Sequence, residues 1–83
     1  EPWAASPYLP LGLVYESQED FGTAAEMLTH AIDREEDNWV LYYLRARVEH
    51  EAGDEAAARA DLREALRLNP REACLEEGPE GCG

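Results

Sequence analysis

Few side chains in this chain of 83 residues have the type and spacing that metal chemistry requires. Histidine occurs twice, as His30 and His50, and these two residues lie far apart in the sequence. A zinc site needs closely spaced Cys or His ligands, usually in pairs. We therefore interpret both histidines as surface residues and predict no metal site around them.

The two cysteines, Cys74 and Cys82, lie in a C-terminal stretch rich in Gly, Pro and Glu. Their spacing matches no zinc pattern, so a metal role is the weakest of three interpretations. A local disulfide is the second. We predict two exposed thiols at a flexible end of the chain.

The acidic run from Asp33 to Asp37 has some of the spacing of a calcium-binding loop. In such a loop the sixth position is glycine and the twelfth is a bidentate glutamate. Here the sixth position is Asn38 and the twelfth is Leu44. The chain also has no nucleophile motif around its serines and no glycine-rich phosphate loop. We therefore predict no cofactor and no enzymatic activity.

The formal net charge of -12 is unevenly distributed along the chain. Residues 1–38 carry -8, residues 39–71 are neutral, and the remaining residues carry -4. An acidic field repels phosphate backbones and anionic lipid, which makes nucleic acid and membrane surfaces poor partners. A neutral or basic peptide fits better. Because no apolar run is long enough to span a bilayer, we expect a soluble fragment of a longer protein, either cytoplasmic or on the soluble side of a membrane-protein parent.

The chain repeats itself at an offset of 34 residues, which is typical of arrays built from one supersecondary unit. Small residues align with small ones and large apolar residues with large ones. The matched pairs are Tyr8 and Tyr42, Gly12 and Ala46, Asp20 and Asp54, Ala24 and Ala58, Leu28 and Leu62, Ala31 and Ala65, and Ile32 and Leu66.

The periodicity predicts an all-α fold, because no segment alternates apolar and β-branched residues as a strand would. Asp20, Asn38 and Asp54 are suited to cap helices that begin directly after them. The first helix begins either after Ser6 or at Leu9 and Pro10, and it carries Leu11, Val14 and Tyr15 at helical spacing. Gly53 is expected to take a positive φ in the turn before Asp54.

These signals divide the chain into five segments. We predict an extended lead-in over residues 1–5, one helix-turn-helix unit over 6–37 and a second over 38–69. A short capping helix follows over 70–77, because Asn69, Pro70 and Glu72 have the order of a helix start. We expect disorder over 78–83.

The combined pattern resembles the tetratricopeptide repeat, a 34-residue helix-turn-helix. The first unit contributes the Leu11-Gly12 step, Tyr15, Ala24 and Ala31, but it has Glu36 where proline is usual. The second contributes Ala46, Ala58, Ala65 and Pro70, with Arg45 and Glu49 where leucine and tyrosine are usual. The resemblance implies two antiparallel units in a right-handed superhelical stack, with Gly12 or Ala46 facing the alanines of the following helix.

The resemblance also implies a concave groove lined by the first helix of each unit. It assigns six residues to partner binding, which are Leu9, Leu13, Glu16, Tyr43, Arg47 and His50. Such a groove binds a peptide or helix without catalysis. The alternative is that these residues cover a third helix or a second copy of the chain. Because arrays of this kind need about three units, a homodimer is also possible.

A second, weaker resemblance is to the helical-repeat tails of bacterial O-antigen ligase or polymerase-like membrane proteins. It is based on Trp3 and the stretch that follows it, and on Trp39 with the residues after it. It implies that the chain is a structural appendage of a membrane glycan enzyme. Elsewhere, Arg45 and Glu49 are four residues apart on one predicted helix and are expected to pair.

Overall fold

The computed structural model describes residues 7–82, which form four α-helices and a short 3₁₀ helix. The helices are α1 (Tyr8–Ser17), α2 (Phe21–Arg34), α3 (Trp39–Glu51) and α4 (Glu55–Leu68), followed by η1 (Ala73–Glu77). No β-strand occurs within these residues. The all-α prediction is therefore confirmed. The predicted lead-in over residues 1–5 lies outside the described part of the chain.

Three of the four helices begin at the polar caps that the sequence predicts. The Asp20 carboxylate accepts a hydrogen bond from the Thr23 backbone N–H, and Asp54 accepts one from Ala57. The Asn38 side chain does the same for Val40. Each bond satisfies one of the backbone donors that a helix start leaves without an intrahelical partner.

Helix α1 begins at Tyr8, with Pro7 in the capping position and no side-chain cap. Pro10 falls within the first turn, where its missing N–H removes no intrahelical bond. The proline that complicates the sequence signal therefore does not delay the helix. Ser6, the cap we predicted as one alternative, lies outside the described residues.

Small side chains hold the two helices of each unit close together, as the aligned pairs predict. Gly12 is buried in α1, and a Cβ atom built there would lie 3.1 Å from Leu28 Cγ in α2. In the second unit Ala46 and Ala58 are both buried. A larger side chain at any of these positions would force the helix axes apart.

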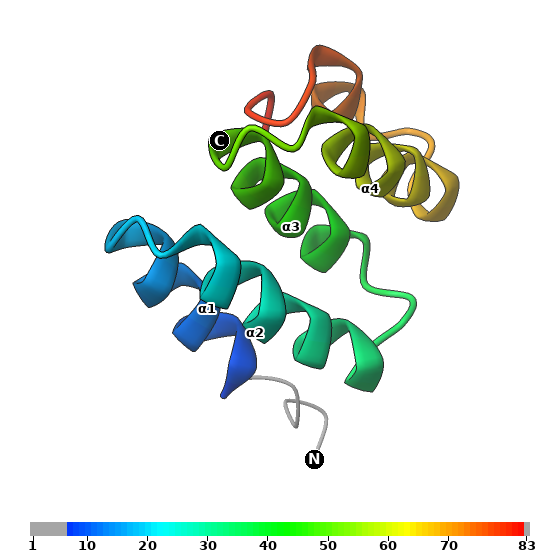
Figure 1. Ribbon diagram of the computed structural model, residues 1–83. Helices are drawn as coiled ribbons and strands as arrows, with labels where there is room; N and C mark the ends of the chain where they lie inside the picture. Colours follow the sequence, from blue (N-terminus) through cyan, green and yellow to red (C-terminus); the bar gives the residue numbers. More distant parts are fainter. Residues whose placement is uncertain (1–6, 83) are drawn as a thin grey trace.

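The two units stack through α2 and α3. Leu41 of α3 packs against Ala31 and Ile32 of α2, and Val48 packs against Ala24 and Leu28. Figure 1 shows the resulting order, in which α1 and α2 form one pair, α3 and α4 the other, and α2 lies beside α3. The right-handed sense of a longer stack remains a prediction.

The C-terminal segment differs from the sequence prediction. Residues 70–72 are not helical, and only Ala73–Glu77 forms a helix, of the 3₁₀ type. Leu75 is buried against Tyr43, Leu62 and neighbouring residues of α3 and α4. The segment therefore caps the second unit at the end of the molecule opposite α1 (Figure 1).

Cys74 and Cys82 form a disulfide, so the prediction of two free thiols is wrong and the alternative holds. Residues 78–82 form turns where we expected disorder. Gly81 fits tightly into this arrangement, because a Cβ atom there would clash with the carbonyl oxygen of Cys74. The anchoring by Leu75 and the covalent closure give the segment an order that its composition does not suggest.

Candidate binding surface

Helix α3 carries two arginine–glutamate pairs, and they point in different directions. Arg45 and Glu49 are one pair, and Arg47 and Glu51 are the other. Residues two apart on a helix lie on opposite sides, whereas residues four apart share a side. The first pair contacts α4 and α2, and the second contacts α1.

The second pair joins the first helices of the two units. Arg47 Nε donates to Glu16 Oε2 at 2.8 Å, and Arg47 Nη2 donates to Glu16 Oε1 at 2.7 Å. Two-point contacts of this kind are among the stronger charge-assisted hydrogen bonds in proteins. The structure therefore brings together two of the six residues assigned to the groove, although 31 positions separate them in the chain.

Glu51 makes this cluster more acidic than a simple ion pair. Its carboxyl group is hydrogen-bonded to that of Glu16, which together with burial raises the pKa of Glu51 to about 7. For Glu16, burial alone would raise the pKa, but hydrogen bonds from Arg47 and Glu51 outweigh it and lower the pKa below its usual value. Two carboxyl groups thus lie close to one arginine that binds only Glu16 directly, and the raised pKa of Glu51 reflects this crowding of acids. We call Glu16, Arg47 and Glu51 the α1–α3 cluster.

The first pair belongs to the packing between helices. Arg45 Nε and Nη2 donate to the Asp61 carboxylate of α4 at 2.8 and 2.7 Å, and Nη1 donates to Thr29 Oγ1 of α2 at 3.0 Å. Glu49 lies 3.8 Å from the same guanidinium. Arg45 and Glu49 thus lie together as expected, and the arginine links three helices.

Burial and a hydrogen bond with Asp61 raise the pKa of Glu49 to about 8. Its Oε1 atom is buried and has no hydrogen-bond partner among the described residues. A proton on Glu49 removes the cost of burying its charge and its repulsion by Asp61, because the neutral acid can donate a hydrogen bond to the Asp61 carboxylate. The hydrogen bond with Asp61 also raises the pKa of Arg45 above its ordinary value.

The other residues that were assigned to the groove differ in their burial and contacts. Leu9 is half-buried between α2 and α3, whereas Leu13 is 39% exposed. His50 is hydrogen-bonded to Glu55 at 2.8 Å, and this contact raises the pKa of His50. Of the apolar residues assigned to the groove, only Leu13 is exposed.

Tyr43 is not available to a partner, because it is only 4% exposed. The backbone N–H of Cys82 donates to Tyr43 Oη at 3.1 Å, and the disulfide holds Cys82 in place. The assignment of Tyr43 to partner binding is therefore wrong for the chain in this state. Contact between residues 39 positions apart leaves no local signal in the sequence.

Two residues on the side of α3 that carries Arg47 were not identified as candidate binding residues from the sequence. Val40 is 37% exposed and lies three and seven residues before Tyr43 and Arg47, so helical spacing places it on the same side of α3. Glu51 follows Arg47 by four residues, a spacing that we used only for Arg45 and Glu49. Both could have been found by extending the periodicity.

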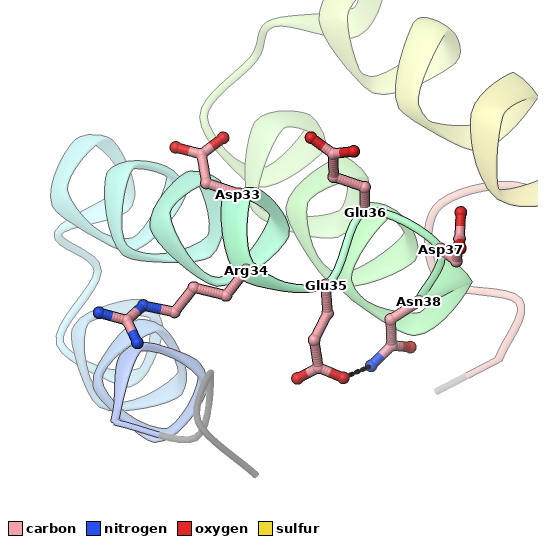
Figure 2. Close-up of a pocket in the computed structure, with 6 residues that line it drawn as sticks. All are labelled: Asp33, Arg34, Glu35, Glu36, Asp37 and Asn38. Carbon is pink, nitrogen blue, oxygen red and sulfur yellow. Dashed lines mark hydrogen bonds between the residues drawn. The ribbon is translucent and has the colours of Figure 1, made fainter. Parts of the chain in front are cut away.

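An open, shallow hollow lies elsewhere, around the α2–α3 connection. It is lined by the consecutive residues 33–38. Figure 2 shows that their side chains diverge: Arg34 points toward α1, Asp33 and Glu36 point to the other side, and Glu35 accepts a hydrogen bond from Asn38. Within residues 7–82 no three His, Cys, Asp or Glu side chains are arranged to hold a metal ion. We assign no function to this hollow.

The comparison with known families agrees with the geometry. The model of the tetratricopeptide repeat family matches residues 5–38 and 40–72, which together make up most of the chain. The chain belongs to the tetratricopeptide repeat family. The match bears out the first resemblance and the two-unit organisation, and it gives no support to the second resemblance.

Among residues 7–82, none of the helices has both the length and the apolar character that crossing a membrane would require.

Proposed function

We propose that the chain is a non-catalytic protein-interaction module that binds a basic peptide or helix across α1 and α3. Proteins of this repeat family serve as interaction scaffolds, which supports the general role. The chemistry of the partner is inferred from the α1–α3 cluster and from the exposed apolar side chains beside it.

The observation that carries the proposal is the excess of carboxylate in the α1–α3 cluster. Arg47 pairs with Glu16 through two hydrogen bonds, and the neighbouring Glu16 carboxyl group raises the pKa of the second acid, Glu51, to about 7. Glu80, in the C-terminal segment, adds negative charge near Glu51 and His50. A lysine or arginine of a partner can pair with Glu51.

Apolar contact would come from Leu13 on α1 and Val40 on α3, both of which are exposed. A peptide that combines a basic residue with one or two large apolar residues therefore matches what this face offers. The net charge of -12 would speed the encounter with a basic partner and repel an acidic one.

The test begins with a random peptide library displayed on phage and selected against the immobilised chain. We expect the selected peptides to be enriched in Lys and Arg and to carry apolar residues. Affinity of a synthetic selected peptide is then measured by fluorescence anisotropy at two salt concentrations. The expected result is weaker binding at high salt.

Matched variants locate the site. Glu51→Lys is expected to weaken peptide binding at least about tenfold, whereas Glu26→Lys, the same charge change on an exposed part of α2, should have a much smaller effect. Leu13→Asp should also weaken binding. The proposal fails if the selected peptides are acidic, or if Glu51→Lys and Glu26→Lys reduce affinity equally while circular dichroism shows both variants folded.

A further inference from the structure

The end of the C-terminal segment covers the hydroxyl group of Tyr43. The backbone N–H of Cys82 donates to Tyr43 Oη at 3.1 Å, and Tyr43 is 4% exposed. The other three tyrosines of the chain are each half-buried. A buried tyrosine hydroxyl needs a hydrogen-bond partner. Here that partner comes from a stretch of chain that belongs to no helix.

Two different anchors hold the C-terminal segment on the second unit. The first is Leu75, which is 2% exposed and packs against side chains of α3 and α4. It fixes η1. The second is Cys82, which packs against the same cluster and makes the hydrogen bond to Tyr43. Residues 78–82 therefore depend on a different anchor from residues 73–77.

The disulfide keeps Cys82 in place. It joins Cys82 to Cys74, the residue before Leu75, across a sequence separation of 8. Between them, Gly81 N–H donates to the Gly78 carbonyl oxygen at 3.1 Å, a contact that is local to the loop. Without the disulfide, one hydrogen bond to α3 would contribute less free energy than the ordering of residues 78–82 costs.

The disulfide can be reached by a small reductant, because Cys74 and Cys82 are both half-buried rather than buried. A dithiol attacks one sulfur as a thiolate, the Cys74–Cys82 bond breaks, and a mixed disulfide forms. The second thiol of the reductant then displaces the remaining cysteine. Both cysteines end as thiols with the two protons of the dithiol, which leaves as a disulfide. The reverse reaction closes the loop again.

We propose that the Cys74–Cys82 disulfide is a redox-controlled clasp on Tyr43. When it is closed, residues 78–82 cover the tyrosine hydroxyl. When a dithiol opens it, these residues detach, Leu75 keeps η1 in place, and the hydroxyl end of Tyr43 becomes exposed. The clasp therefore changes one contact surface without unfolding the second unit.

The consequence for binding rests on the function proposed above. Tyr43 lies three residues after Val40 and four before Arg47, so all three lie on the same side of α3. An exposed Tyr43 adds an aromatic edge and a hydrogen-bonding hydroxyl to the surface offered to a peptide. The reduced chain is therefore expected to bind a selected basic peptide more tightly than the oxidised chain.

The clasp itself is tested without any ligand. Ring signals of Tyr43 and methyl signals of Leu75 are followed by NMR in the presence of a soluble, neutral gadolinium chelate, which broadens the signals of exposed groups. On reduction with dithiothreitol, verified by thiol titration, we expect the broadening of the Tyr43 Hε signals to increase at least about threefold. The Leu75 methyl signals are expected to stay protected.

A matched variant shows that the effect comes from this bond. Replacing both Cys74 and Cys82 by serine should expose Tyr43 to the same extent with and without dithiothreitol. Two results would overturn the clasp. One is a Tyr43 ring that stays protected in the reduced chain. The other is exposure of Leu75 together with Tyr43, which would make the disulfide a structural brace of the whole segment.

Peptide affinity is then measured by fluorescence anisotropy for the oxidised and reduced chains. We expect reduction to strengthen binding at least about threefold. Tyr43→Phe should abolish most of this gain, whereas Tyr42→Phe, which removes a hydroxyl from the adjacent residue, should preserve it. Equal affinities of the two redox forms would overturn the link between the clasp and binding. If neither form binds a basic peptide, the proposed function fails, and the NMR result alone decides the clasp.

Discussion

The two units have the same internal packing but different surroundings. Gly12 and Ala46 contact the following helix in the same way, and Ala24, Ala58, Ala31 and Ala65 are all buried. In contrast, α3 is enclosed by α2, α4 and the C-terminal segment, whereas among the described residues 7–82 the neighbours of α1 lie on one side only. The repeat pattern thus determines the contacts within a unit, and the neighbours determine which of its other faces are exposed.

The charged residues follow the same rule. Arg45 and Arg47 stand where the first unit has Leu11 and Leu13, and both arginines bind carboxylates of other helices. Arg45 binds Asp61 within its own unit, whereas Arg47 binds Glu16 of the first unit. The equivalent leucines of α1 are exposed.

The largest expected effect contrasts the leucines that anchor α2 and α4. Leu28 is fully buried at the junction of both units, while Leu62 is 9% exposed. Leu28→Ala should lower the free energy of unfolding by about 3–4 kcal/mol and Leu62→Ala by about 2–3 kcal/mol. Urea denaturation followed by circular dichroism measures both. Equal losses, or a larger loss for Leu62, would contradict the view that the unit boundary is the best-packed part of the core.

Removing the disulfide affects the second unit alone. Replacing Cys74 and Cys82 by serine is expected to lower the free energy of unfolding by about 2 kcal/mol and to weaken the cover over Tyr43. Amide hydrogen exchange should show faster exchange at Cys82 and unchanged exchange in α2. Thiol titration of the unmodified chain gives the control. Full reactivity of both thiols in the folded protein, without reductant, would refute the disulfide.

The pH dependence of stability tests whether Glu49 is protonated in the folded chain. The pKa of Glu49 is about 8 in the folded chain, against an ordinary value of 4.5. Between these values Glu49 binds more protons in the folded state than in the unfolded state, so its contribution to stability is fully present below about pH 4.5 and is lost as the pH rises to about 8. Glu51 and His50, whose pKa values are also raised, act in the same direction.

Glu49→Gln should therefore flatten this curve and stabilise the chain at pH 8 by on the order of 1 kcal/mol. The amide keeps a donor for Asp61 and cannot ionise. Glu26→Gln removes one exposed acid and serves as the control for net charge. Denaturation midpoints measured at pH 5, 6.5 and 8 give the pH dependence of stability for both variants and the unmodified chain. Identical slopes for the two variants would show that Glu49 is ionised throughout.

The smallest expected effect lies in the turns between the helices of each unit. Gly53 has a φ of 90° in the second unit, as predicted, and its equivalent Glu19 has a φ of 62° in the first. A residue with a Cβ atom is strained in this region. Glu19→Gly should therefore stabilise the chain by about 0.5 kcal/mol, measured by urea denaturation. A loss of stability would mean that the turn of the first unit is not strained.

Much of the fold could be predicted because its determinants are local or periodic. Asp20, Asn38 and Asp54 each cap a helix through a backbone N–H two or three residues later, so the helix starts can be predicted locally. The alanines recur at the 34-residue offset. The two-point contact between Glu16 and Arg47 was not predictable as a bond, because it depends on how the units stack. The same holds for Asp61, because its sequence neighbours do not indicate that Arg45 of the adjacent helix binds it.

The C-terminal segment was predicted least well. Its composition favours disorder, and neither the burial of Leu75 nor the contact between Cys82 and Tyr43 leaves a periodic trace. Both arise from packing against a surface that α3 and α4 create together. The sequence predicted a capping helix after the second unit, but it did not indicate that this segment would cover Tyr43.

The central claim is that α1 and α3 are equivalent helices, one open and one covered. The most direct test compares the free energies of unfolding of Val14→Ala and Val48→Ala, which are the same substitution at matched positions. We predict a loss of about 2 kcal/mol for Val48→Ala and less than about 0.5 kcal/mol for Val14→Ala. Equal losses from the two variants would contradict the account.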